Sequence, residues 1–343
     1  MSICYVMASL YPSGGNKMIV EHVKRLAARG HEAVVTVVTK HKSDDVKWLE
    51  LEGVKIVDFN KAVLDNYTNI VATYWETYYS IKDLKLEGPR FHYFVQSKEE
   101  DFESNIARKN RVRGTLTDRN FNLFTEAKWI QEYLGTNFGR NSSLVPNHVE
   151  LPANLDTTKR PRVKPIILIE GEALTPWKNI SFGAKVARQL RPEMTVKLLT
   201  STPYSKLAFN TAASFDEVIN MVSWKESLEL IAQADVLYRP SLLEGFNGAI
   251  AEAMCLGTPV VANKIPASYE QGIADWNCCL VDIDQVGDTV SKIKLLLVNK
   301  SHREHIIANA KQTAKSNFSD WSKSIDILEN NVFMEFYEER DLK

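Results

Sequence analysis

The stretch Asp235-Val-Leu-Tyr-Arg-Pro-Ser-Leu-Leu-Glu-Gly-Phe-Asn-Gly-Ala-Ile-Ala-Glu252 decides how this chain folds. Its first residues form a short, mostly apolar run that predicts a buried strand over 235–239, and a helix is predicted over 247–256. A strand, a short loop and a helix are the repeating parts of a parallel α/β sheet. Ligands of such sheets bind at the carboxyl ends of the strands, which is where Glu244 is expected to lie.

The start of this helix has the features of a phosphate site. The N–H groups of residues 246–249 have no partner inside the helix and carry partial positive charge, which favours an anion. Gly245 and Gly248 let the backbone approach a ligand closely. Glu252, one to two turns into the helix, is placed to accept hydrogen bonds from hydroxyl groups beside the phosphate. The alternative is that Glu244 is a solvated loop charge and Glu252 an ordinary acid near a helix N-terminus.

The length of 343 residues is enough for about two domains. The 42 Lys and Arg residues nearly cancel the 43 Asp and Glu residues, so no overall basic field predicts a nucleic-acid partner. No apolar run approaches the ~18 residues of a membrane span, and the N-terminus lacks the cationic region of a signal peptide. We expect a cytoplasmic protein, and a peripheral position at the inner face of a membrane is left open.

The cysteines are Cys4, Cys255, Cys278 and Cys279, and their spacing is not that of a metal site or a disulfide framework. Adjacent Cys278 and Cys279 are a poor start for either. Free thiols in a reducing compartment are the simpler interpretation, and no metal site is predicted.

Short β-rich runs alternate with amphipathic stretches along the chain, which predicts α/β architecture. The strands of the first half are predicted at 3–8, 33–38, 54–57, 70–73, 91–95 and 122–125, with a turn at 12–15 and a helix over 16–29 that Gly30 ends. The second half is predicted to have strands at 166–169, 195–200, 235–239 and 259–262 and helices at 176–190, 226–234 and 247–256. Residues 146–165 carry four prolines and predict the connection between the halves.

The last predicted helix has one apolar face. Its members are spaced three or four residues apart: Trp321, Ile325, Leu328, Val332 and Phe336. The pattern as a whole predicts two doubly wound domains with a cleft between them.

Residues 240–262 resemble the core motif of the retaining family-4 glycosyltransferases, which have the GT-B fold. The shared pattern is two glutamates separated by seven residues, then Ala-Met, a Gly-Thr-Pro turn and a strand. Weaker matches elsewhere are Gly14-Gly15, Val145-Pro-Asn-His-Val-Glu150, Trp177-Lys178-Asn179 and Gln233-Ala-Asp-Val236. The resemblance implies two Rossmann-like domains around a cleft: an acceptor-side domain of residues 1–147, joined by a helix at about 321–343 that crosses back to it, and a donor domain of residues 148–320.

The same resemblance implies an enzyme that moves a sugar from a nucleoside-diphosphate sugar to a hydroxyl of a glycan or lipid-linked glycan. It implies retention of configuration, a role in polysaccharide or glycoconjugate synthesis, and no metal cofactor. Glu244 would contact the transferred sugar and Lys178 the diphosphate, as the catalytic pair. The implied donor-binding residues are Gly14, Gly15, Phe246, Asn247, Gly248 and Glu252, and Ser223 and Trp224 are assigned to the base by position alone.

Lys178 also stands out on physical grounds. Thr175 is a suitable N-cap and Pro176 suits the first helical position, so Lys178 is predicted in the first turn of a helix. A cation there opposes the helix dipole by roughly 0.3–1 kcal/mol, and a bound anion would reverse this effect. The alternative is a surface lysine without a role.

The acceptor is expected against the first domain, where Tyr74, Trp75 and Gln96 are the lining candidates. Ordinary packing after a strand explains the two aromatic residues equally well. A basic cluster, consisting of Arg108, Lys109, Arg111, Arg113 and Arg119, would suit a lipid-diphosphate acceptor or a membrane surface, but a solvated face is the expected interpretation.

The chain departs from the family pattern at three positions. Glu172 stands where relatives usually have an arginine, and Asn247 replaces a common glycine. Gln96 and Ser97 occupy the place of a catalytic-site histidine or aspartate, and His92 is expected to be a packed strand residue.

Two rival functions are left open, and the departures at Glu172 and at Gln96 and Ser97 favour the first of them. One is a catalytically inactive nucleotide-sugar-binding or partner protein, and the other is a different GT-B enzyme such as a phosphorylase or an epimerase. A dinucleotide dehydrogenase is excluded, because Gly14-Gly15 is not the spaced three-glycine fingerprint.

Overall fold

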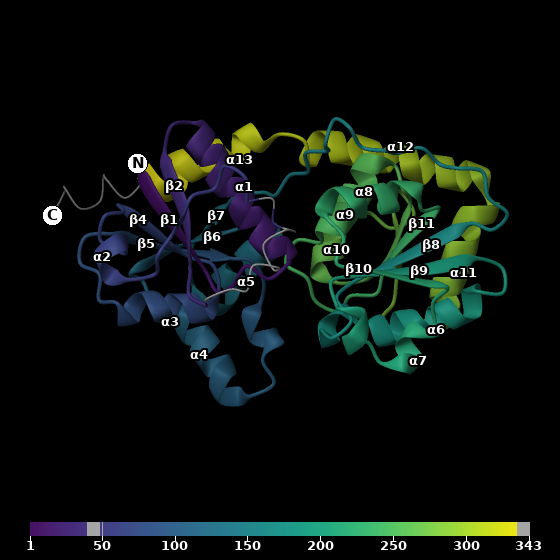
Figure 1. Ribbon diagram of the computed structural model, residues 1–343, viewed down its shortest axis with the longest axis horizontal. Coiled ribbons are helices and arrows are strands. Elements are labelled where there is room, and N and C mark those ends of the chain that lie inside the picture. The colour runs from purple at the N-terminus through teal and green to yellow at the C-terminus, as the bar shows by residue number, and fades with distance from the viewer. Residues whose placement is uncertain (40–48, 50, 335–343) are drawn as a thin grey trace. The chain divides into compact units, whose positions relative to one another are not determined.

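The computed structural model describes residues 1–39, 49 and 51–334 of the chain. These residues form two compact units. Unit 1 consists of Met1–Asn147 and the segment that begins at Asp320, and unit 2 consists of His148–Ser319. Each unit is a parallel sheet with helices on both faces (Figure 1).

The sheet of unit 1 has the strand order β3-β2-β1-β4-β5-β6-β7, and every pair is parallel. The strands are β1 Ser2–Met7, β2 Glu32–Val37, β3 Ile56–Val57, β4 Asn69–Ala72, β5 Arg90–Val95, β6 Phe121–Thr125 and β7 Ser143–Leu144. The helices are α1 Gly14–Ala28, α2 Lys61–Leu64, α3 Trp75–Asp83, α4 Ile106–Thr117 and α5 Lys128–Phe138. The six predicted strands are present, although the third spans two residues, and β7 was not predicted.

Side-chain alternation along β1 explains why both faces of this sheet are covered. Ile3, Tyr5 and Met7 point to one apolar core, which they share with residues of α1 and of the C-terminal helix. Cys4 and Val6 point to the opposite core, together with residues of α3 and α5. All five side chains are fully buried, as in a parallel sheet covered on both sides.

The predicted first helix begins earlier than expected. Ser13 is its N-cap, with a side-chain oxygen that accepts from the Asn16 N–H at 3.1 Å, so Gly14 and Gly15 lie in the first turn of α1. The end is as predicted, because Gly30 follows the helix with a left-handed φ of 88°.

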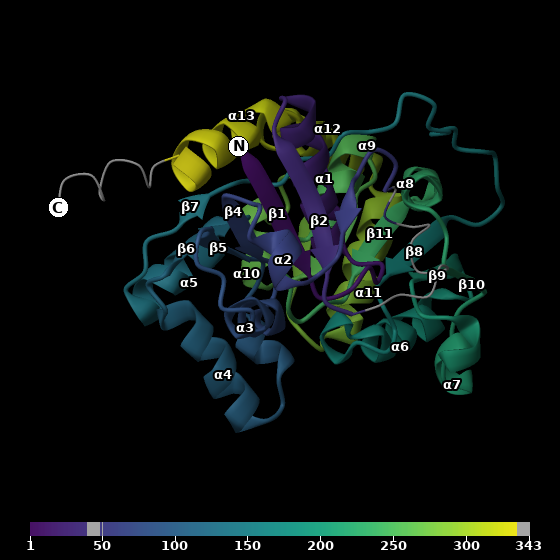
Figure 2. The same cartoon turned by 60° about the vertical axis from the view of Figure 1, so that its left-hand side comes forward.

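The C-terminal helix packs against unit 1, as the predicted fold requires. It consists of α13, Trp321–Ile327, and a π-helical segment, Leu328–Met334, in which the predicted apolar positions are buried. Figures 1 and 2 both show α13 beside α1. The Ser324 hydroxyl donates to the Pro146 carbonyl at 2.6 Å, and Phe336 lies outside the described residues.

The sheet of unit 2 repeats this topology with the order β10-β9-β8-β11-β12-β13, again all parallel. The strands are β8 Ile166–Glu170, β9 Thr195–Thr200, β10 Glu217–Asn220, β11 Val236–Arg239, β12 Val260–Asn263 and β13 Cys279–Val281. The helices are α6 Ile180–Leu190, α7 Phe209–Ala212, α8 Trp224–Gln233, α9 Gly248–Leu256, α10 Pro266–Gln271, α11 Val286–Val298 and α12 Lys300–Asn317. In both units the chain reverses its direction across the sheet between the first and fourth strands, and this is the switch point where ligands of such sheets bind.

Two apolar cores sandwich the sheet of unit 2. Residues of α6 and α11 cover one face, and residues of α8, α9 and α12 cover the other. The helices from 266 to 317 were not predicted. No helix among the described residues is both long enough and apolar enough to cross a membrane.

Candidate functional site

The candidate site lies at the switch point of unit 2, between the carboxyl ends of β8 and β11. Lys178 follows β8, and Glu244 follows β11. The Lys178 Nζ atom donates to both oxygens of the Glu244 carboxylate, at 2.8 and 2.7 Å. The structure therefore brings together the two residues that the sequence assigns to catalysis.

Glu244 is a buried carboxylate, with a side chain only 9% exposed. Burial by itself raises its pKa, but the charges of Lys178 and Arg239 outweigh this effect and hold the pKa below its ordinary value. Glu244 is therefore ionised at neutral pH, as a fixed hydrogen-bond acceptor at the sheet edge.

Arg239 was missed by the sequence interpretation. It is the last residue of β11, and its side chain is 4% exposed. One Nη atom donates to Glu244 Oε1 at 2.7 Å, and the other donates to the Glu170 carbonyl at 2.9 Å and pairs with the Glu170 carboxylate. A charged residue at the end of an apolar strand was the available signal, because its side chain has to find buried partners at that edge.

The predicted helix over 176–190 is broken at its start. Pro176–Lys178 form a 3₁₀ turn, Asn179 has a left-handed φ of 54°, and α6 begins at Ile180. Thr175 makes no cap hydrogen bond; its hydroxyl donates to the Glu172 carboxylate instead. The prediction that Lys178 lies in the first turn of a long helix is therefore wrong, and Glu244 rather than the helix dipole is its electrostatic partner.

Gly171 makes room for this turn. A Cβ atom at position 171 would lie 2.9 Å from Ile180 Cδ1 and 3.3 Å from Lys178 Cβ. Glu172, which stands in the place of the expected arginine, accepts from the Thr202 hydroxyl at 2.7 Å as well as from Thr175. Its carboxylate thus holds the loop together.

The helix α9 begins within one residue of its predicted start, and the phosphate site there stays a prediction. Asn247 is the N-cap residue, and α9 begins at Gly248, where a Cβ atom would meet no atom within 4 Å. The Asn247 side chain is 1% exposed, makes no cap hydrogen bond, and neither of its amide atoms has a partner among the described residues. The Phe246 ring packs edge-on against Phe318. Its backbone, rather than its ring, is therefore the part expected to contact a ligand.

Glu252 and Trp224 are held together. The Trp224 Nε1 atom donates to Glu252 Oε1 at 2.8 Å, which fixes the carboxylate one helical turn after Gly248. Ser223 is the N-cap of α8 in a capping box with Glu226, so its hydroxyl is already engaged.

The switch point of unit 1 brings Gly15 and Gln96 together. A Cβ atom at position 15 would lie 2.7 Å from Gln96 Oε1, so the Gln96 side chain would have to shift, whereas Gly14 has open space around it. Gln96 Nε2 donates to the Thr73 carbonyl at 3.3 Å. His92 is fully buried and bonded to Asn69, which confirms it as a packed strand residue.

Tyr74 and Trp75 differ in exposure. Tyr74 is half-buried at the N-cap of α3, but Trp75 is only 1% exposed. The guanidinium groups of Arg108 and Arg111 cover the Trp75 ring, at 5.0 and 5.3 Å from its centroid. The Trp75 ring is therefore not available to stack on a sugar, and the alternative interpretation, ordinary packing after a strand, agrees with the structure.

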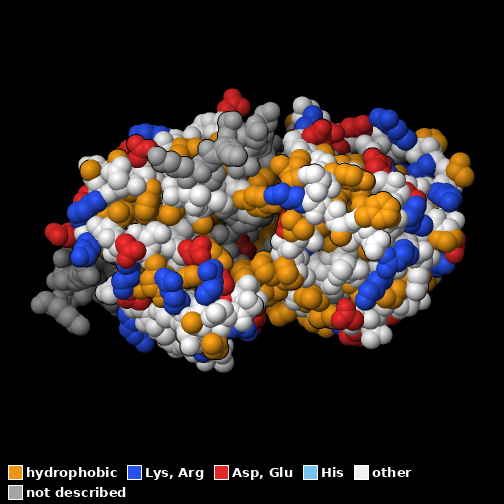
Figure 3. Space-filling view, turned by 60° about the horizontal axis from the view of Figure 1, so that its bottom comes forward, with side chains coloured by type: hydrophobic (Ala, Val, Ile, Leu, Met, Phe, Trp, Pro, Cys, Tyr) orange, Lys and Arg blue, Asp and Glu red, His pale blue; other side chains and the backbone are white. Residues whose placement is uncertain are grey.

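Two residues of the basic cluster, Arg108 and Arg113 on α4, are paired with acids. Arg108 bonds Glu103 and Glu76, and Arg113 bonds Glu100 at 2.9 Å. Figure 3 shows acidic side chains interspersed with basic ones on this side of unit 1. This arrangement is the solvated, ion-paired face that the sequence favours.

Glu99 is a second buried carboxylate, and the sequence interpretation missed it. It is 3% exposed and accepts from the Trp75 N–H at 2.8 Å and the Tyr93 hydroxyl at 2.7 Å. Burial raises the pKa of Glu99 to about 8, although these two hydrogen bonds oppose the shift.

Residues 158–313 match the sequence profile of the family described as Glycosyl transferases group 1. The match covers less than half of the chain and lies within unit 2. The matched part contains the Lys178–Glu244 pair, Arg239 and Glu252. The match supports a group 1 glycosyltransferase, and the predicted retaining family-4 subtype stays a prediction.

A curated relative supports the same family. The MMP alpha-(1->4)-mannosyltransferase of Mycolicibacterium hassiacum is 29% identical over 183 residues, which are 49% of this chain and 44% of that protein. The chain therefore matches less than half the length of this relative.

Solved structures share the fold over nearly the whole chain. Anabaena HepE, solved in complex with UDP and glucose, aligns with a TM-score of 0.81 and 15% identity over 97% of this chain and 99% of that one. Sucrose-phosphate synthase from Thermosynechococcus elongatus aligns with a TM-score of 0.77 and 14% identity over 96% and 98%. The chain thus has the predicted GT-B fold; the predicted cleft and the assigned ligand contacts stay predictions.

The charge pairing at Glu244 predicts a measurable loss of stability. Arg239→Gln leaves two carboxylates without their buried cation, so the free energy of unfolding should fall by about 3–5 kcal/mol in urea unfolding. The double variant Arg239→Gln/Glu244→Gln should lose less than the sum of the single variants, because Glu244 no longer needs a counter-charge. The exposed pair Lys294–Glu193 gives the control: Lys294→Gln should change little. Additive losses would contradict the pairing.

Glu99 predicts a pH dependence of stability. Between its ordinary pKa of 4.5 and its folded pKa of about 8, the folded protein holds a proton that the unfolded chain releases. The free energy of unfolding therefore falls as pH rises in this window, by up to about 1.4 kcal/mol per pH unit from this group. Glu99→Gln should remove that slope, while the exposed control Glu87→Gln keeps it. Parallel wild-type and Glu99→Gln curves from pH 5 to 8 would show that Glu99 is already ionised.

Proposed function

We propose that this chain transfers a sugar from a nucleoside-diphosphate sugar to a hydroxyl group of a glycan or lipid-linked glycan. The observation that carries the proposal is the ionised Glu244 carboxylate, held between Lys178 and Arg239 at the switch point and next to the start of α9. A fixed carboxylate suits sugar hydroxyls, and a nearby cation and helix N-terminus suit a diphosphate.

Unsatisfied polar atoms at this edge support a ligand. Both side-chain amide atoms of Asn247 are buried and have no hydrogen-bond partner among the described residues. The same is true of Asn179 Nδ2 and Arg239 Nε. Buried polar atoms are nearly always hydrogen-bonded in native proteins, so their concentration beside Glu244 needs an explanation. A polar ligand or its bound water would supply the missing partners.

Donor binding would rearrange the ion pair. Lys178 Nζ is bonded to Glu244, and the incoming diphosphate would compete for this ammonium group. Arg239 would keep Glu244 ionised after Lys178 turns to the phosphate, because its own bond to Glu244 does not involve the lysine. Glu252, oriented by Trp224, is the proposed partner of the ribose hydroxyls.

We propose that the transfer proceeds with retention. The bond between the anomeric carbon and the phosphate oxygen breaks, the acceptor oxygen bonds the same carbon on the same face, and the acceptor proton passes to the leaving phosphate. Lys178 and the first amides of α9 would stabilise the charge that develops on the phosphate. This positive charge comes from the chain itself, so the proposed reaction needs no metal ion.

A second candidate is a nucleotide-sugar-binding protein without transferase activity. The observation that favours it is Glu172, a carboxylate in the place where relatives usually have an arginine. Its bonds to Thr175 and Thr202 are compatible with a structural role and leave Lys178 as the proposed phosphate cation.

The donor site predicts a thermal shift. A panel of UDP-, GDP- and dTDP-sugars should contain at least one that raises the melting temperature, since a ligand at 100 times its Kd stabilises by about 2.7 kcal/mol. Lys178→Ala should abolish most of the shift, whereas Lys185→Ala, an exposed lysine on α6, should keep it. If no nucleotide sugar shifts the wild type, the proposed donor site is wrong.

Turnover separates the two candidates. With the donor found in this panel, the enzyme should release the nucleoside diphosphate, and exhaustive EDTA treatment should leave the rate unchanged. Glu244→Ala should lower the rate by about 100-fold or more, the loss typical of one transition-state-stabilising group. The exposed Glu304→Ala is the control. Binding without any release favours the inactive protein, and a loss in EDTA that manganese restores contradicts metal independence.

A further inference from the structure

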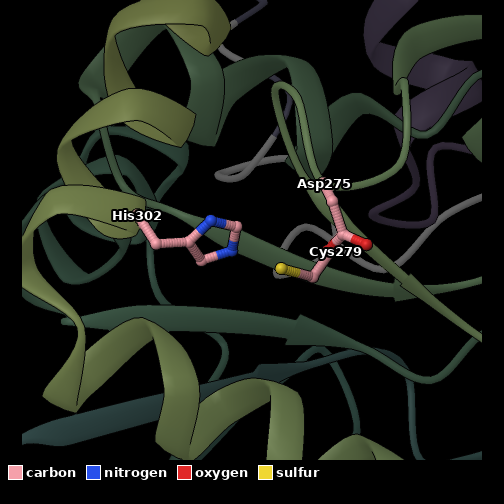
Figure 4. A group of neighbouring side chains, drawn as sticks. All are labelled: Asp275, Cys279 and His302. Carbon is pink, nitrogen blue, oxygen red and sulfur yellow. The ribbon is translucent and has the colours of Figure 1, made fainter.

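Three residues with metal-binding side chains meet at the amino edge of the unit 2 sheet. Asp275 lies in the turn before β13, Cys279 is the first residue of β13, and His302 is in the first turn of α12. One ligand atom from each lies within 4.8 Å of the others. Figure 4 shows the His302 ring facing the Cys279 sulfur, with the Asp275 carboxyl group beside them.

The burial of these atoms points to a ligand. Cys279 is fully buried, and His302 Nε2 is buried with no hydrogen-bond partner among the described residues. A buried imidazole nitrogen without a partner is unusual and needs an explanation. Asp275 is exposed, so the cluster has one open side through which a small ion can enter.

The cluster is held in place by its surroundings. The turn around Asp275 is closed by a hydrogen bond from its own N–H to the Cys278 carbonyl at 2.8 Å. Asn277 bonds Thr313, and Asn309 bonds the Trp276 carbonyl, so the turn is tied to α12 at two further points. Asn299 caps α12 by accepting from the His302 N–H. The three side chains therefore come from backbone that is fixed without an ion.

We propose that Asp275, Cys279 and His302 bind one zinc ion. Thiolate, imidazole and carboxylate are the ligands that zinc uses in proteins, whereas magnesium and calcium prefer oxygen alone. In a tetrahedral shell, zinc bonds of about 2.3 Å to sulfur and 2.0–2.2 Å to nitrogen or oxygen place two ligand atoms of one ion roughly 3.4–3.6 Å apart. Small side-chain rotations bring the three atoms from within 4.8 Å to this range. A water molecule completes the four-coordinate shell.

The charges of the bound state balance. Zinc replaces the proton of the Cys279 thiol, which passes to solvent, and the thiolate and the Asp275 carboxylate together neutralise the ion. Lys292 donates to both Asp275 oxygens, at 2.8 and 3.0 Å. A carboxylate that binds zinc through one oxygen keeps the other for Lys292, which then acts as an outer hydrogen-bond partner. If Lys292 instead excludes the ion, the chain will bind no zinc.

The site is structural rather than catalytic. Cys279 begins β13, and in a parallel sheet the amino ends of the strands lie opposite the carboxyl edge that holds Glu244. An ion there connects the last strand of the sheet to α12. It would stabilise unit 2 without touching the proposed donor.

The test uses the full chain after removal of metal by dialysis against EDTA. Added ZnCl₂ should bind with a stoichiometry of one and raise the melting temperature. Cobalt in place of zinc should show the charge-transfer absorption of a cobalt–thiolate bond, and Cys279→Ala should abolish that absorption. His302→Gln should weaken zinc binding at least about tenfold, the loss typical even for an outer partner of a metal ligand.

Matched controls lie next to the ligands. Cys278→Ala removes the neighbouring buried thiol, and His305→Gln removes an exposed imidazole three residues further along α12. Both should bind zinc like the wild type. Absence of zinc binding, no thiolate absorption, or equal binding by His302→Gln would overturn the proposal. Should Cys279→Ala fail to fold, His302→Gln, a change at a half-buried helix position, still decides the outcome.

Discussion

The constraint on which the rest of unit 2 depends is the burial of the Glu244 carboxylate. Removing such a group from water is costly, and only close opposite charges reverse the effect on its pKa. Arg239 reaches it from the end of β11, and Lys178 reaches it from the turn after β8. Both β–α connections at the switch point are therefore held by one charge. A side chain at position 171 would force Ile180 and Lys178 in the neighbouring turn to shift.

Much of the fold could be predicted because the buried strands of a parallel sheet are short apolar runs between helices. The predicted strand at 195–200 has the observed bounds, the run at 166–169 is one residue shorter than β8, and the run at 3–8 is displaced by one residue from β1. The proximity of Lys178 and Glu244 follows from the same pattern, because neighbouring parallel strands end at one edge. The prediction of a nucleotide-sugar donor came from the family resemblance, because the spacing of apolar residues predicts helices and strands but not the ligand.

The missed features depend on contacts between segments far apart in the chain. The sequence Thr175-Pro-Trp-Lys favours a helix start, yet Asn179 takes a left-handed conformation that breaks the predicted helix. Trp75 follows a strand, as a lining residue would, but two arginines of α4 close over its ring. In the sequence, Glu99 resembles the neighbouring surface acids. In the folded protein it is buried and accepts hydrogen bonds from Tyr93 and from the first residue of α3. Local propensity cannot anticipate such arrangements, because the partners come from other elements.

The replacement of the expected arginine by Glu172 changes how positive charge reaches the switch point. Arg239 brings a guanidinium group to the same edge from a neighbouring strand, but its bonds are to Glu170 and Glu244. It can keep Glu244 ionised, and its Nε is the guanidinium nitrogen without a partner among the described residues. Lys178 also pairs with Glu244, and in the proposed reaction it becomes available when a diphosphate competes for it. Under that proposal the two cations divide two tasks: Arg239 holds the carboxylate and Lys178 receives the phosphate, so that a site with an extra acid could still accept an anionic donor.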